Sequence, residues 1–166
     1  MSKYHIKLAV IGKGNKMTKS RRDVVEANHY SGCNCAQSVF AAYYDLFLPG
    51  IEKEAAMKLA LSFGGGLART QGVCGAACGS AMLLGLKYGP VQMPTSDEIW
   101  DYHGIVREFL QDFKDINGSI YCSEIVRCDI TTPESYEQAH ENMEHYCTKA
   151  IMSAADLLEG KYSILD

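Results

Sequence analysis

Seven cysteines are the residues of this 166-residue chain whose type and spacing could do chemistry. The count is odd, so they cannot all pair within one chain. In a reducing compartment, so many cysteines favour metal binding or thiol chemistry over a structural disulfide framework. The cysteines are Cys33, Cys35, Cys74, Cys78, Cys122, Cys128 and Cys147.

The spacing of these cysteines names no chemistry locally. No C-x-x-C pair of the thioredoxin type occurs, and no C-x-x-C-H of c-type haem attachment. The paired C-x-x-C pattern of a zinc ribbon is also missing from the sequence. A site would therefore have to be assembled in space from distant elements.

Cys74 follows three consecutive glycines, residues 64–66, and precedes an apolar segment at residues 76–86. Glycines disfavour a helix and the apolar segment favours one, so Cys74 is expected in the first turn of a buried helix. Free N–H groups and the helix dipole there would lower its thiol pKa, which makes Cys74 a candidate nucleophile or metal ligand. The alternative is that Cys74 is one more small buried residue.

The apolar residues recur at helical spacing, and the helix start and stop signals agree with them. The sequence predicts an all-α single-domain bundle of about six to seven helices. Ser20 with Asp23, and Thr95 with Glu98, resemble capping boxes. The expected helices cover residues 20–29, 34–47, 52–63, 74–88, 95–117 and 121–126, with a last helix, straight or bent, from Pro133 through Cys147 to about Leu158.

Residues 1–16 form a separate N-terminal extension in this prediction, and residues 17–166 form the helical domain. Apolar and other residues alternate between Tyr4 and Val10, which is typical of a short strand. Met17 is an alternative start of the chain.

Composition excludes several classes of function. The formal net charge of −4 argues against nucleic acid as the main partner. No apolar run approaches the roughly 18 residues of a transmembrane helix, so no membrane insertion is expected. The N-terminus lacks the pattern of a signal peptide, and a cytoplasmic location is the default expectation.

Four segments together resemble the small C-GCAxxG-C-C proteins, roughly from Met17 to Lys161. Residues 32–37 (GCNCAQ) are similar to the family's opening motif, and residues 74–79 (CGAACG) to its central signature. Residues 118–124 (GSIYCSE) resemble the third cysteine motif, and Cys147 with the helix after it resembles the fourth.

The resemblance implies a redox-active protein whose four motif cysteines act together as catalytic thiols, cofactor ligands or metal ligands. Those residues are Cys35, Cys74, Cys122 and Cys147. A related cysteine domain in haem-containing electron-transfer proteins implies an iron–sulfur cluster as a candidate cofactor. The extra cysteines at 33, 78 and 128 could be resolving thiols, alternative ligands or small apolar residues.

Two classes of function remain open from the sequence. The first is a redox protein with four converging cysteines. It would act either in thiol–disulfide exchange, with the Cys74 thiolate attacking a redox partner protein or small thiol compound, or in electron transfer through an iron–sulfur cluster. The second is a non-catalytic helical subunit, such as one in a transporter-linked assembly, with packing or zinc-binding cysteines. A homodimer is compatible with both.

Overall fold

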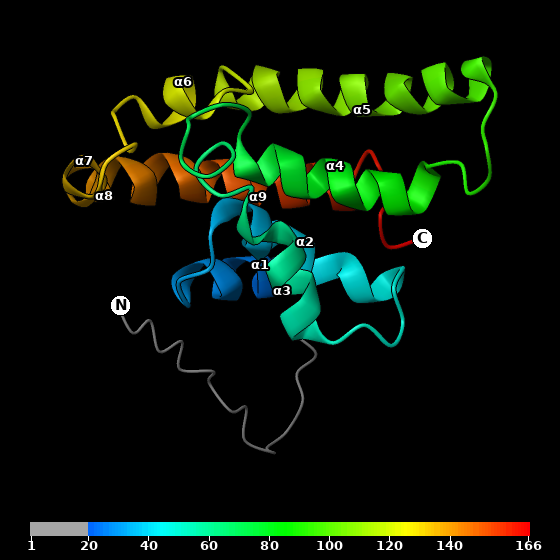
Figure 1. Ribbon diagram of the computed structural model, residues 1–166, viewed down its shortest axis with the longest axis horizontal. Helices are drawn as coiled ribbons and strands as arrows, with labels where there is room; N and C mark the ends of the chain where they lie inside the picture. Colours follow the sequence, from blue (N-terminus) through cyan, green and yellow to red (C-terminus); the bar gives the residue numbers. More distant parts are fainter. Residues whose placement is uncertain (1–19) are drawn as a thin grey trace.

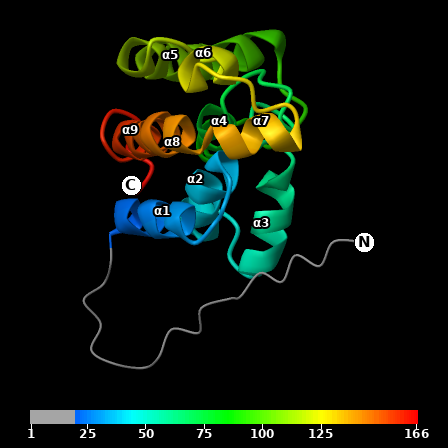
Figure 2. The ribbon, with the colours of Figure 1, turned by 90° about the vertical axis from the view of Figure 1, so that its left-hand side faces the viewer.

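The computed structural model describes residues 20–166, and these form an all-α fold in three layers (Figures 1 and 2). One outer layer holds α5 (Ser96–Asn117) and α6 (Cys122–Val126). The middle layer contains α4 (Gly75–Tyr88) beside α9 (Thr148–Glu159), and the other outer layer contains the first three helices. The all-α prediction is confirmed, whereas the strand expected near the N-terminus lies outside the described residues.

The remaining helices are short. The first outer-layer helices are α1 (Arg21–Tyr30), α2 (Cys35–Tyr43) with a 3-10 turn at Tyr44–Leu46, and α3 (Lys53–Leu61). Before α9 come α7 (Pro133–Gln138), α8 (His140–Asn142) and a π-helical turn at Met143–Cys147. None of the helices described between residues 20 and 166 is both long and apolar enough to cross a membrane.

Between residues 20 and 166, capping boxes begin four helices. The boxes at Ser20 and Thr95 confirm the start signals of α1 and α5. Asn34 begins α2 in the same way, with its side chain accepting from the Gln37 N–H at 3.0 Å. Because an N-cap side chain stabilises a helix by about 1 kcal/mol, these short helices depend on such starts.

The last predicted helix, from Pro133 through Cys147 to about Leu158, is not one continuous element. The bend falls at Ala139, whose N–H donates to the carbonyls of both Ser135 and Tyr136. The π turn follows, and it ends at Cys147. A π turn inserts an extra residue into the helix and is frequent at functional sites.

The core lies between the layers and is contacted by α4 from the centre. Phe109 and Phe113 of α5 are fully buried, but Ile99 and Ile116 at its two ends are 37% and 42% exposed. The apolar stripe predicted for this helix is therefore buried only in its middle. Leu59 of α3 is 57% exposed.

Candidate functional site: a chain of five thiols

All four motif cysteines lie where a helix begins. Cys35 and Cys122 are the first residues of α2 and α6, and Cys74 is the N-cap of α4. Cys147 ends the π turn that continues into α9. All seven cysteines are free thiols in this structure.

Two glycines of α4 let α2 approach closely enough to bring Cys35 beside Cys74. A Cβ on Gly79 would lie 2.8 Å from the Ala36 carbonyl oxygen. A Cβ on Gly75 would lie 3.3 Å from the Cys35 Cβ and 2.7 Å from the Phe63 carbonyl oxygen. A side chain at either position would push the two helices apart.

A two-residue β-bridge places Cys74 and Cys122 next to each other. Val73 pairs with Tyr121 in antiparallel fashion. The Cys74 N–H donates to the Ile120 carbonyl at 2.8 Å, and the Cys122 N–H donates to the Gly72 carbonyl at 2.7 Å. Val73 and Tyr121 are 36% and 47% exposed. Since successive side chains of extended backbone point to opposite sides, the two cysteines that follow them point inward.

The loop before Cys74 coils in the left-handed sense. Five consecutive residues, 65–69, have φ between +51° and +70°, and Gln71 has φ +60°. Hydrogen bonds from Ala68 N–H to the Ser62 carbonyl and from Gly72 N–H to the Gly66 carbonyl close this coil, at 2.7 and 3.0 Å. Left-handed backbone costs a non-glycine residue about 1–2 kcal/mol, so the loop stores strain next to the cysteines.

Cys147 reaches the site from the other side of the molecule. Its side chain raises the pKa of the Cys35 thiol, and both residues pack against the large core. Cys147 packs against both apolar clusters of the fold: the large core that contains Cys74, and a small cluster that contains Cys122. The structure therefore brings all four motif cysteines into one region.

Interactions among the thiols link the motif cysteines to one another and to Cys128. Cys147 and burial raise the pKa of Cys35, and Cys35 and Cys122 add to the rise that burial causes at Cys74. Cys35 and Cys128 add to the rise that burial causes at Cys122, and Cys128, a cysteine outside the four motif positions, packs against the small apolar cluster of Cys122. The five thiols are hereafter called the thiol chain, with Cys147 and Cys128 at its two ends.

Burial holds the inner thiols in their protonated form. The neighbouring Cys147, together with burial, raises the pKa of the Cys35 thiol well above its usual range. Burial, reinforced by Cys35 and Cys128, raises the pKa of Cys122 to about 12. These thiols are therefore poor nucleophiles until a proton is removed or the site opens.

The expectation of a lowered pKa at Cys74 is wrong in direction. The N–H groups of Ala76 and Ala77 do favour its thiolate, but burial and the neighbouring Cys35 raise the pKa by more. Only 4% of Cys74 is exposed, because the bridge to Tyr121 and the α2 contact cover it. Arg69, which could have paired with a thiolate, instead lies over the Tyr136 ring at 3.8 Å.

We expect Cys78 to react with iodoacetamide at least about tenfold faster than Cys74 in the reduced, metal-free protein near pH 8. Cys78 is partly exposed, whereas Cys74 is buried with a raised pKa. Time-resolved alkylation followed by peptide mass spectrometry measures both rates in one sample, and the two rates should converge in denaturant. An equal or faster rate for Cys74 in the folded protein would contradict the burial argument.

The cysteines do not form a ligand set for a metal in this conformation. Within residues 20–166, no group of three or more His, Cys, Asp or Glu side chains is arranged to hold a metal ion. The arrangement thus gives no support to a zinc site or to four-thiolate ligation of an iron–sulfur cluster.

Two polar residues that support the thiol chain were missed by sequence reasoning. Asn34 donates its side-chain N–H to the Leu61 carbonyl at 2.8 Å, which ties the start of α2 to the end of α3. Gln71 donates its side-chain N–H to the Cys128 carbonyl at 2.8 Å. The Asn34–Gln37 spacing is a readable capping-box signal, but nothing in the sequence marks Gln71.

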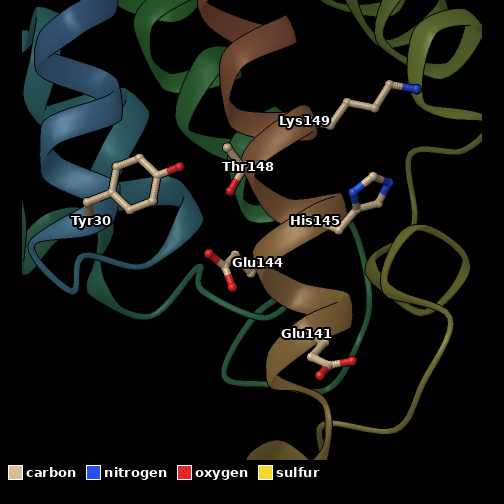
Figure 3. A pocket seen from close by; sticks show the side chains of 6 residues that line it. All are labelled: Tyr30, Glu141, Glu144, His145, Thr148 and Lys149. Carbon is tan, nitrogen blue, oxygen red and sulfur yellow. The ribbon is translucent and has the colours of Figure 1, made fainter.

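An open cavity of about 390 Å³ lies between the end of α1 and the segment that carries Cys147 (Figure 3). Glu144 and Thr148 lie on the side that faces Tyr30, whereas His145 and Lys149 point away from it. The polar groups of this cavity do not converge on one point. None of the cysteines is among its lining residues.

A comparison with known protein families also draws attention to the cysteines. A family described as "Putative redox-active protein (C_GCAxxG_C_C)" matches residues 33–160. The chain belongs to this family. The match spans all seven cysteines and every helix from α2 to α9. Comparisons with curated proteins and with solved structures gave no match.

Proposed function

We propose that this C-GCAxxG-C-C protein is a dithiol–disulfide protein in which Cys147 and Cys35 form the reacting pair. One observation carries the proposal: Cys35 and Cys147 pack against the same core, and Cys147 raises the pKa of the Cys35 thiol, although the two residues come from α2 and from the turn before α9. Both thiols are free in this structure. Membership of a family described as redox-active supports the same chemistry.

Cys147 is the attacking thiol in this proposal, in place of Cys74. It is partly exposed, whereas Cys74 is buried and carries a raised pKa. The Cys147 thiolate attacks one sulfur of a disulfide R–S–S–R, and RS⁻ leaves with the electron pair. The mixed disulfide then lies against the Cys35 thiol.

Cys35 resolves the mixed disulfide. Its proton passes to solvent or to the departed thiolate, and the Cys35 thiolate attacks the Cys147 sulfur, releasing the second RS⁻. In total, two protein thiols are oxidised to one disulfide, R–S–S–R is reduced to two R–SH, and the protons balance. The raised pKa of Cys35 makes this second step the slow one.

In the test, the reduced protein is mixed with glutathione disulfide in the absence of oxygen. Acid quenching, alkylation and peptide mapping are expected to show a Cys35–Cys147 disulfide as the first protein disulfide. Cys147→Ser should abolish it, and Cys35→Ser should leave Cys147 trapped as a mixed disulfide with glutathione. Cys33→Ser is the matched control, because Cys33 is also partly exposed but interacts with Ser31 and Lys53 rather than with a cysteine.

The same preparation distinguishes the other candidate functions. If iron and sulfide are bound in stoichiometric amounts after anaerobic purification, the function is electron transfer through an iron–sulfur cluster and not thiol–disulfide exchange. Colourless protein that forms no disulfide with glutathione disulfide would favour cysteines that only pack. Both results would overturn the proposal.

A further inference from the structure

We propose that Cys128 is a second access thiol, through which an external disulfide exchanges with the buried pair Cys122 and Cys74. The inference rests on the proposed exchange function and extends it: the thiol chain has two ends, and the cysteine at each end is partly exposed. Cys128 is not one of the four motif cysteines, so the family motif does not assign it this part.

After α6 the chain turns back, so that Cys128 lies near the start of this helix. Cys122 begins α6, the helix ends at Val126, and Arg127 takes the left-handed conformation with φ +61°. The chain therefore reverses within one residue of the helix end. Cys122 and Cys128 then pack in the same small apolar cluster, together with Val126 and Ile130.

The loop that leads to Cys74 holds both sides of this turn. The Gln71 side chain donates to the Cys128 carbonyl at 2.8 Å, and the Ser123 N–H donates to the Gln71 carbonyl at 3.3 Å. Gln71 stands three residues before Cys74, on the segment bridged to Tyr121. Cys74, Cys122 and Cys128 are thus fixed by one hydrogen-bonded unit.

Of Cys74, Cys122 and Cys128, only Cys128 is exposed enough to meet an external disulfide. Cys74 and Cys122 are 4% and 5% exposed, too little for an external disulfide to reach their sulfurs, whereas Cys128 is partly exposed. Cys78 is also partly exposed, but burial alone shifts its pKa and no cysteine contributes. Among the cysteines outside the motif, Cys128 is the one that packs against an apolar cluster containing a buried motif cysteine.

The exchange steps balance. The Cys128 thiolate attacks R–S–S–R and expels RS⁻, and the Cys122 thiolate then attacks the Cys128 sulfur and expels the second RS⁻. The Cys74 thiolate attacks the Cys122 sulfur of the resulting Cys122–Cys128 disulfide and releases the Cys128 thiolate. The products are a buried Cys74–Cys122 disulfide and two R–SH, with Cys128 regenerated.

The experiment uses the full chain carrying Cys147→Ser, which closes the first end. With glutathione disulfide as the probe, this variant is expected to form the Cys122–Cys128 disulfide and then the Cys74–Cys122 disulfide. Adding Cys128→Ser should slow formation of the Cys74–Cys122 disulfide at least about tenfold. Adding Cys78→Ser, the matched control, should change it less than about twofold. Cys128→Ala repeats the test, and circular dichroism verifies the fold of each variant.

The outcomes separate this inference from the proposed function. An undiminished rate without Cys128, or glutathione that stays on Cys128 with no attack by Cys122, overturns the second access thiol. If the wild-type protein still forms the Cys35–Cys147 disulfide in that case, the proposed function stands alone. If neither disulfide forms in the wild-type protein, the proposed function fails and the inference fails with it.

Discussion

Alanine in place of Gly79 is expected to lower the free energy of unfolding by about 2 kcal/mol. The new Cβ would lie 2.8 Å from the Ala36 carbonyl oxygen and 3.3 Å from the Ala36 Cα. Both are backbone atoms of α2, so no side chain can turn away to make room. The strain must be relieved by moving α2 away from α4, which opens the core between them.

Gly104→Ala is the matched control for this substitution. Gly104 also lies inside a helix, α5, but a Cβ there would meet nothing within 4 Å. Alanine favours a helix over glycine by about 1 kcal/mol, so this variant should be more stable than the wild type. Urea unfolding of both variants gives the comparison. Equal stability of Gly79→Ala and the wild type would show that the two helices are not held at this distance.

The same displacement should reach the thiols. Cys35 directly precedes Ala36, and its Cβ lies 3.3 Å from where a Cβ on Gly75 would stand. Moving α2 outward separates Cys35 from Cys74 and weakens its alignment with Cys147. In Gly79→Ala, disulfide formation between Cys35 and Cys147 is therefore expected to slow, while Gly104→Ala should leave it unchanged.

Local signals in the sequence were sufficient for much of the fold. The Thr95–Glu98 pair and the apolar stripe after it predicted α5, and the structure places that helix at Ser96–Asn117. The predicted helix ranges placed Cys35 and Cys122 near helix starts, and the two residues occupy the first positions of α2 and α6. These features depend on residues within one turn of each other, so a sequence window contains them.

Features that depend on distant contacts were not predictable. The pKa of Cys74 is governed by burial under segments that are remote in sequence, and that burial outweighs the N–H groups at the start of α4. The contact between Cys128 and Cys122 requires the left-handed turn at Arg127, and arginine gives no sign of it. The family motif named the four cysteines but neither their order in space nor the second end of the thiol chain.

The left-handed loop before Cys74 should respond in opposite directions to two substitutions. Gly66 is buried with φ +70°, and a Cβ there would lie 2.6 Å from the Gly72 nitrogen. Gly66→Ala adds both left-handed strain and a backbone clash, so a loss of about 3 kcal/mol of unfolding free energy is expected. Ala68 is exposed with φ +51°, so Ala68→Gly should instead stabilise the protein by about 1 kcal/mol.

Urea unfolding of the two variants tests the backbone strain in the loop. The alkylation rate of Cys74 tests whether the loop keeps this thiol covered. In Gly66→Ala the coil cannot close on Gly72, whose carbonyl accepts from the Cys122 N–H. Cys74 should then lose its cover and react faster with iodoacetamide, whereas in Ala68→Gly its rate should stay at the wild-type value. A stabilising effect of Gly66→Ala, or a destabilising one of Ala68→Gly, would mean that the loop does not adopt the left-handed coil. The burial of Cys74, which removes it as the attacking thiol, would then lose its structural basis.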